Sequence, residues 1–337
     1  MEQERKAIRL GLVLITCATV WRLMGGIAGP VSALLSKPET AAFLLYLQTG
    51  RVVSSLETGE PTQTPTLPEQ TGQTQPPLPE GISFDREDAQ LVQVSNLCDY
   101  TVDLEQMLLT PLEWRLVGEK PTVLIIHSHT TESYTQTQEN TYQASAQYRT
   151  LDTQYNMVRV GEAVKTMLEE QGISVLHDKT LHDHPSYNDA YIHAREQVQA
   201  YLAQYPSICL VLDLHRDALE NGSGKQMGTQ ALVDGASAAQ LMMVVGTNAG
   251  GREHPGWADN MALAVKLHAQ LEKRWPGLCR PISFRTERFN QDLSPGAMLI
   301  EVGAAGDTLE KALVAAGALA QGIGALAHGT LTADSTS

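Results

Sequence analysis

The segment Val123–Tyr134, VLIIHSHTTESY, places metal-binding side chains directly after a predicted strand. Its first four residues are aliphatic and mostly β-branched, as is typical of a strand inside a parallel sheet. His127, His129 and Glu132 follow within six residues. Because active sites in open α/β sheets collect at the carboxyl ends of the strands, this order predicts a functional site. A short strand followed by an ordinary polar loop is the alternative interpretation.

Two further predicted strands carry side chains of the same chemistry. The strand Ile208–Leu214, ICLVLDL, is followed by His215, and the strand Met298–Val302, MLIEV, holds Glu301 among aliphatic residues. A histidine after a core strand is often only a hydrogen-bonded structural residue. Its combination with the H-x-x-E pair of the first segment favours a ligand, because one turn of backbone can direct both members of that pair at one cation.

Two histidines and one carboxylate, with a fourth position open to water, form the ligand set of hydrolytic zinc. Zinc lowers the pKa of its bound water from about 15.7 to near 7, which makes hydroxide available at neutral pH. The sequence therefore predicts a site built from Glu132, His215 and either His127 or His129, of which His129 forms the H-x-x-E pair with Glu132. Glu301, flanked by aliphatic residues, suits a proton-transfer group because burial raises the pKa of a carboxyl. Alternatively, Glu301 is a solvent-exposed residue on one face of an edge strand.

The residues around His215 have candidate supporting roles. Asp213 and Asp217 can accept hydrogen bonds from a ligating imidazole. Arg216 can position a substrate carboxylate or stabilise an oxyanion, and it can equally form an ion pair with Asp217.

Strands alternate with helices along the rest of the sequence, which predicts an α/β fold with a mostly parallel or mixed sheet flanked by helices. Asp307 is the expected N-cap of the last helix, with Glu310 completing a capping-box pattern. The remaining predicted strands are Ile173–Leu176 and Leu241–Val245, and the predicted helices are Met157–Glu170, Tyr187–Tyr205, Trp257–Arg274 and Asp307–Ala327.

Composition excludes some classes of protein. The formal net charge of -14 argues against a nucleic-acid-binding protein, which would normally present a basic face. None of the four cysteines belongs to a C-x-x-C pair, so a thiolate zinc site is not expected.

The N-terminal quarter of the sequence is predicted to be a membrane anchor and a tether. Residues 1–36 place three basic residues before an apolar run that Arg22 interrupts, which predicts an uncleaved single-pass membrane anchor. A cleaved signal peptide is the alternative. The basic flank predicts a cytoplasmic N-terminus with the catalytic part outside the cytoplasm. Residues 37–57 form a membrane-proximal segment, residues 58–82 a disordered spacer rich in Pro, Thr and Gln, and residues 83–330 the catalytic domain.

Several segments together resemble the stage II sporulation protein P family: HSHTTESY, YNMVRVGEAVKTML with GISVLHDKTLHD, VLDLHRDA, VVGTN, and RFNQDLSPGAMLIEVG. The resemblance covers the motif-bearing core, residues 122–327. It implies a membrane-anchored, zinc-dependent N-acetylmuramoyl-L-alanine amidase, with a fold like that of cell-wall amidases and zinc carboxypeptidases. Such an enzyme cleaves the amide between N-acetylmuramic acid and L-alanine in peptidoglycan. The resemblance also implies action at the sporulation septum during engulfment, beside the lytic transglycosylase stage II sporulation protein D.

Carried onto this sequence, the resemblance implies His129 and His215 as zinc ligands and Glu301 as the catalytic carboxylate. The zinc carboxypeptidase pattern indicates Glu132 as the third ligand. In the broader cell-wall amidase pattern the acidic ligand precedes a helix, which indicates Asp152 instead. We expect Glu132, with Asp152 as the alternative.

The resemblance also indicates other residues that can belong to the site. His127 is an alternative to His129 as a ligand. Arg288 and Asn290, just before the last strand, are candidates for binding peptide or glycan. Two other functions remain open: a zinc carboxypeptidase acting on stem peptides, and a non-catalytic wall-binding scaffold with an amidase fold.

Overall fold

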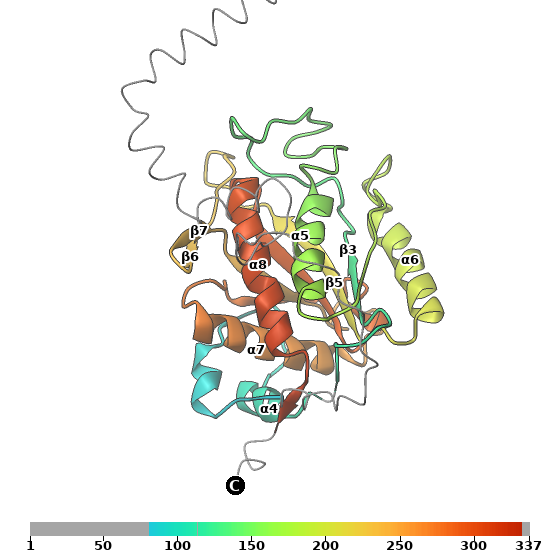
Figure 1. Cartoon of the computed structure of the whole chain (residues 1–337), viewed down its shortest axis with the longest axis vertical. Helices are drawn as coiled ribbons and strands as arrows, with labels where there is room; N and C mark the ends of the chain where they lie inside the picture. The colour runs from blue at the N-terminus through green and yellow to red at the C-terminus, as the bar shows by residue number, and fades with distance from the viewer. Residues whose placement is uncertain (1–80, 113, 332–337) are drawn as a thin grey trace, which may run out of the picture. The chain divides into compact units, whose positions relative to one another are not determined.

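A seven-stranded mixed sheet forms the centre of the protein, in a computed structural model that describes residues 81–112 and 114–331 (Figure 1). The spatial order is β2-β9-β8-β10-β5-β3-β4. Strands β10, β5, β3 and β4 run parallel to one another, as do β2, β9 and β8, and the two groups meet antiparallel at β8 and β10. The strands are β2 (Val94–Asn96), β3 (Val123–Ile126), β4 (Val175–His177), β5 (Leu210–Asp217), β8 (Leu241–Val245), β9 (Ile282–Phe284) and β10 (Ala297–Ala304).

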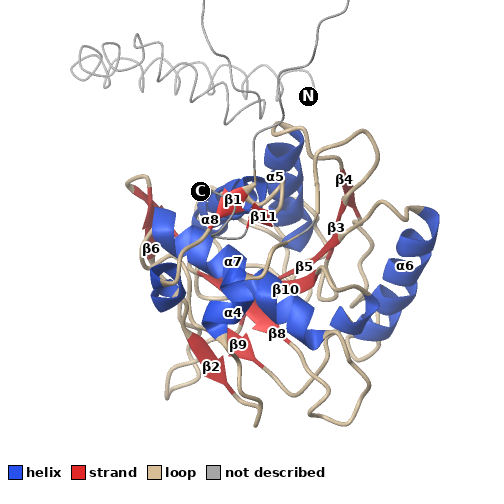
Figure 2. Ribbon diagram, turned by 90° about the horizontal axis from the view of Figure 1, so that it is seen from below, coloured by secondary structure: helices blue, strands red, loops and turns tan. Residues whose placement is uncertain are grey.

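Helices cover both faces of this sheet (Figure 2). Alternate residues of β5, such as Leu210, Leu212 and Leu214, join the large apolar core with the helices α5 (Met157–Glu169), α7 (Trp257–Arg274) and α8 (Leu309–Ala325). On the opposite face, Val211 joins a smaller core with α6 (Ala190–Gln204). Because side chains alternate along a strand, Asp213 and His215 lie on the α6 face with Val211. The predicted α/β sheet flanked by helices is confirmed.

Smaller elements complete the described chain. Helix α4 (Leu104–Leu109) ends before Pro111 and packs against α7. Two short pairs lie outside the main sheet: β1 (Ile82–Ser83) with β11 (Thr330–Leu331), and the hairpin of β6 (Ala231–Val233) with β7 (Ala236–Ala238).

The expected cap of the last helix was wrong. Thr308 is the N-cap of α8, and its side chain accepts a hydrogen bond from the backbone N–H of Lys311. The Asp307 carboxylate instead accepts hydrogen bonds from the N–H groups of Thr229 and Ala304. Asp307 therefore joins the loop before β6 to the end of β10.

The predicted anchor, the membrane-proximal segment and the spacer up to residue 80 lie outside the described residues. Within residues 81–112 and 114–331, none of the helices is both long and apolar enough to cross a membrane.

Burial of the positively charged Lys266 lowers the free energy of unfolding, and replacing this residue should recover the loss. Lys266 is 1% exposed, and burial lowers its pKa to about 8 from 10.5. Below pH 8 Lys266 is charged in the folded protein, and burial of this charge lowers the free energy of unfolding. This loss of stability shrinks as the pH rises from 8 towards 10.5. Since one pKa unit is about 1.4 kcal/mol and Lys266 donates one hydrogen bond to the Met107 carbonyl, Lys266→Met should stabilise the protein by about 1–2 kcal/mol at pH 7.

Thermal melts of both proteins across pH 6–10 check this expectation. The variant should melt a few degrees higher at pH 7, and the difference should shrink as pH rises above 8. A variant that melts lower than the native protein at pH 7 would show that the Met107 hydrogen bond outweighs the burial cost.

Candidate metal centre

Three adjacent parallel strands bring the predicted site residues to one edge of the sheet. Ile126, the last residue of β3, pairs with Asp213 of β5, and His215 of β5 pairs with Glu301 of β10. His215 and Glu301 are therefore direct neighbours on the α6 face. Strand β10 lies between β5 and β8, so the alternative of an exposed edge strand for Glu301 does not hold.

His129, Glu132 and His215 form a cluster that can hold a metal ion. One ligand atom from each lies within 4.8 Å of the other two. Nδ1 of His129 is 3.6 Å from Oε1 of Glu132, and Nδ1 of His215 is 3.5 Å from Oε2 of the same carboxylate. Both separations exceed the usual 2.7–3.2 Å of an N–H···O hydrogen bond. Ligand atoms at 2.0–2.1 Å from a tetrahedral zinc are about 3.3 Å apart, which is close to the two separations between Glu132 and the histidines.

Arginine side chains hold Glu132 in place. Nη1 of Arg216 is 3.4 Å from Oε1 of Glu132, and the backbone N–H of Arg216 donates to Oε2 at 3.3 Å. Arg149 donates to Oε1 at 3.3 Å. Burial opposes ionisation of Glu132, but Arg216 and the two histidines outweigh it and hold its pKa well below the usual range. Glu132 is therefore an anion, as a metal ligand must be.

The Arg216 side chain is buried and makes its hydrogen bonds within the protein. Its Nε donates to the Ser133 carbonyl and its Nη2 to the Tyr148 carbonyl, both at 3.1 Å, and the residue is 6% exposed. This placement favours support of Glu132 over the expected contact with substrate. The alternative ion pair with Asp217 is not formed, because Asp217 pairs with Arg280 at 2.6 Å.

Asp213 lies behind His215. Its Oδ1 is 2.8 Å from Nε2 of His215, without the angles of a hydrogen bond, and both carboxylate oxygens accept hydrogen bonds from Ser128. Burial disfavours the imidazolium, but Asp213 and Glu132 outweigh it and raise the pKa of His215 well above its usual value. A carboxylate on the far nitrogen is the arrangement that orients a metal-ligating histidine.

Glu301 stands beside this cluster with an unpaired oxygen. Its Oε2 is buried and has no hydrogen-bond partner among the described residues. Burial, reinforced by the charge of Glu132, raises the pKa of Glu301 to about 8 against the opposing effect of His215. A carboxyl that gains and loses a proton near neutral pH suits general acid–base chemistry.

The two alternative ligands lie outside the cluster. His127 is fully buried, with Nδ1 2.9 Å from the Leu214 carbonyl and Nε2 2.9 Å from Nε2 of His177. Both of its ring nitrogens are thus engaged elsewhere. Asp152 is exposed, and its carboxylate accepts a hydrogen bond from the N–H of Gln154.

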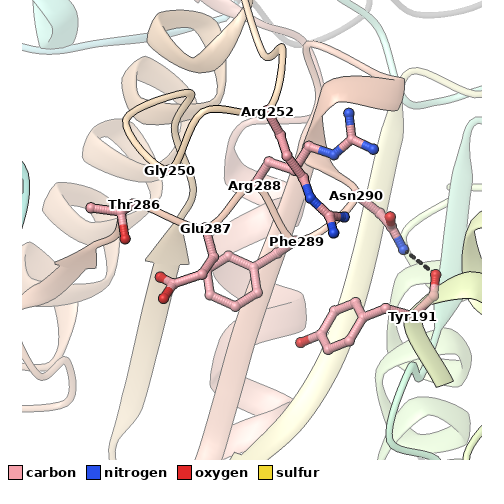
Figure 3. A pocket seen from close by; sticks show the side chains of 8 residues that line it. All are labelled: Tyr191, Gly250, Arg252, Thr286, Glu287, Arg288, Phe289 and Asn290. Atoms are coloured by element: carbon pink, nitrogen blue, oxygen red, sulfur yellow. Dashed lines mark hydrogen bonds between the residues drawn. The ribbon is translucent and has the colours of Figure 1, made fainter. Parts of the chain in front are cut away.

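Arg288 and Asn290 line a neighbouring pocket of about 340 Å³ (Figure 3). The side-chain amide of Asn290 donates to the Tyr191 carbonyl at 2.8 Å, which fixes the wall of the pocket. Arg288 donates to the Glu253 carbonyl at 3.2 Å. Both residues therefore share this pocket with Tyr191.

Sequence reasoning missed the aromatic side chains that cover the centre. Tyr187 stacks on His129 with ring centroids 4.6 Å apart, and the Arg149 guanidinium lies 4.6 Å from the Tyr187 ring. Tyr191 of α6 lies 5.3 Å from His129 and 6.3 Å from His215. Tyr187 lies before the start of α6 at Ala190 and Tyr191 lies within the helix, so helical spacing does not link the two tyrosines.

The fold and this cluster define an α/β protein with a candidate His–Glu–His metal centre at the carboxyl edge of parallel strands. The chain belongs to the stage II sporulation protein P (SpoIIP) family, whose model matches residues 56–324.

Known proteins similar to this chain come from several bacteria. Stage II sporulation protein P of Bacillus subtilis (strain 168) is 30% identical over 216 residues, which are 60% of this chain and 50% of that protein. The chain thus matches half the length of this relative. N-acetylmuramoyl-L-alanine amidase AmiC2 of Nostoc punctiforme has a TM-score of 0.35 at 13% identity, covering 61% of this chain and 97% of its own. The amidase Ami1 of Mycobacterium smegmatis has a TM-score of 0.36 at 13% identity, covering 62% and 96%.

Proposed function

We propose that this chain is a peptidoglycan hydrolase of sporulation that cleaves the amide between N-acetylmuramic acid and L-alanine. The observation that carries the proposal is the cluster of His129, Glu132 and His215 beside Glu301, in a member of the stage II sporulation protein P family. We further propose that the cofactor is Zn²⁺, because the ligand set and its spacing suit that ion. When bound there, zinc would supply Lewis acidity and lower the pKa of water.

The protein's own residues account for the movement of protons. Hydrolysis consumes one water: the lactyl carbonyl gains a hydroxyl, the C–N bond breaks, and the amine of L-alanine takes up a proton. Glu301 can accept the proton that water loses and deliver it to this nitrogen, since its pKa is raised to about 8. Arg216 keeps Glu132 ionised, and Asp213 orients His215.

The place of action and the partner are also proposals. The predicted anchor would hold the protein at the sporulation septum with its catalytic domain outside the cytoplasm. There it would act with the lytic transglycosylase stage II sporulation protein D on the same glycan strands.

Chelation and product analysis test this function together. We expect the purified full chain to release intact stem peptides from peptidoglycan, to lose this activity after treatment with a strong chelator, and to recover it when zinc is restored. Mass spectrometry of the digest gives the readout, with unreacted peptidoglycan as the control.

The alternatives predict different products. A zinc carboxypeptidase would leave shortened stems on the glycan, and a non-catalytic scaffold would leave peptidoglycan intact while binding to it. Either result would overturn the amidase proposal, and full activity in the presence of chelator would overturn the metal assignment.

A further inference from the structure

A pocket with excess positive charge adjoins the metal centre. This arginine pocket is lined by Tyr191, Gly250, Arg252, Thr286, Glu287, Arg288, Phe289 and Asn290. In the view of Figure 3, both guanidinium groups are on the Asn290 side of the pocket and the Glu287 carboxylate is on the other side. Such charge is notable in a chain whose formal net charge is -14.

Tyr191 joins the pocket to the metal centre. Its ring is 5.3 Å from that of His129 and 6.1 Å from that of Phe289, measured between centroids. Tyr191 therefore belongs both to the wall of the arginine pocket and to the surroundings of the metal centre.

The charge in the pocket is not balanced by the neighbouring carboxylates. Arg252 has no ion-pair partner within the described part of the chain. Arg288 is 3.2 Å from Oδ2 of Asp292, but the same carboxylate already receives both Nη atoms of Arg195, at 2.8 and 2.7 Å. Glu287 pairs with Arg285 at 3.3 Å. The pocket therefore retains charge for an anionic group.

The walls of the pocket are held close together, so the pocket is formed before any ligand binds. The N–H of Gly250 donates to the Thr286 carbonyl at 2.9 Å, and the N–H of Thr247 donates to the Glu287 carbonyl at 3.2 Å. A Cβ on Gly250 would lie 2.7 Å from the Thr286 oxygen, and one on Gly246 would lie 2.2 Å from the Glu287 oxygen. Only glycine permits this approach of the two loops.

We propose that the arginine pocket binds a carboxylate of the stem peptide and so makes Arg252 and Arg288 determinants of substrate specificity. The inference rests on the proposed amidase function, which places the peptide beyond the scissile amide. Guanidinium groups bind carboxylates through charge-assisted and often paired hydrogen bonds, which a carboxamide cannot match. The nearest candidate is the free α-carboxylate of the residue that follows L-alanine.

The test uses two glycan–peptide substrates that differ only at this group, which is a free carboxylate in one and a carboxamide in the other. The full chain should cleave the carboxylate substrate with a kcat/KM about 10–100-fold higher, mainly through a lower KM, as expected for a charge-assisted hydrogen bond. In the double variant Arg252→Met, Arg288→Met, this preference should fall to about one. Arg159→Met is the matched control, because Arg159 is an exposed arginine of α5, on the other face of the sheet.

The results that would contradict the role of the pocket differ from those that would contradict the amidase function. A preference that survives in the double variant, or that is absent from the native chain, would overturn the role of the pocket while leaving the amidase function intact. If neither substrate is cleaved, the proposed function fails, and calorimetric binding of the two free peptides tests the pocket separately. Tighter binding of the carboxylate peptide, lost in the double variant, would then support the pocket, and equal binding would reject it.

Discussion

Replacing Glu301 with glutamine is expected to lower the rate of amide hydrolysis by about 10²–10⁴-fold, the usual contribution of general acid–base catalysis. Glutamine keeps the size of the side chain but cannot accept the proton from water. Because burial raises the pKa of Glu301 to about 8, the carboxyl must take up a proton on folding at pH 7, and a neutral amide avoids this cost, so the melting temperature should not fall. Rates on purified peptidoglycan and a thermal melt of the same protein check both parts.

Glu170→Gln provides the matched control for this variant. Glu170 is an exposed carboxylate after α5, and the same substitution there should leave the rate unchanged. Binding of the Glu301→Gln protein to intact peptidoglycan should also persist. A Glu301→Gln protein with nearly native activity would show that another group moves the proton.

The sequence predicted the strands that contain mostly apolar runs of four or more residues. Strands β3, β5, β8 and β10 were recognised in this way, because a strand buried on both faces leaves no polar alternation. Strand β9, Ile282–Phe284, is only three residues long with a central serine, and its partner β2 is equally short. Such short strands form because neighbouring strands supply their hydrogen bonds, and the sequence of the strand itself does not reveal these partners.

One missed element did have a local signal. The hairpin of β6 and β7 turns at Asp234-Gly235, where both residues have positive φ, at 51° and 85°. Asp-Gly between apolar residues is a strong indication of a two-residue hairpin turn.

The residues of the candidate metal centre were predictable from the sequence, but the side chains that support them were not. Strand ends marked His129, His215 and Glu301, since polar residues after apolar runs stand out in any sequence. The role of Arg216 depended on which carbonyls lie near its guanidinium, and those of Ser133 and Tyr148 come from a loop without periodic pattern. Glu132 was the expected third ligand, with Asp152 as the alternative that the amidase pattern implied. Only the fold places one in the cluster and leaves the other exposed.

Because Glu132 lies in the cluster and Asp152 is exposed, the two residues should differ in their effect on zinc binding. Glu132→Gln should abolish stoichiometric zinc binding, whereas Asp152→Asn should retain it. Glu132 contacts both histidines of the cluster, so the amide removes a charged ligand and weakens affinity by more than the about 10–100-fold that loss of an outer partner costs. Elemental analysis of each protein after dialysis against a weak chelator gives the metal content directly.

The buried arginine beside Glu132 makes a second variant necessary. Removing the carboxylate leaves Arg216 without its ion pair, and breaking a buried pair costs about 3–5 kcal/mol of stability. His215→Ala disrupts the same metal site without unpairing Arg216, so zinc that is lost from this variant as well is not explained by loss of the Arg216 ion pair. Zinc retained by both variants, or lost from Asp152→Asn, would move the third ligand away from Glu132. Loss of zinc from both, with Asp152→Asn unaffected, is the result that the geometry of the cluster requires.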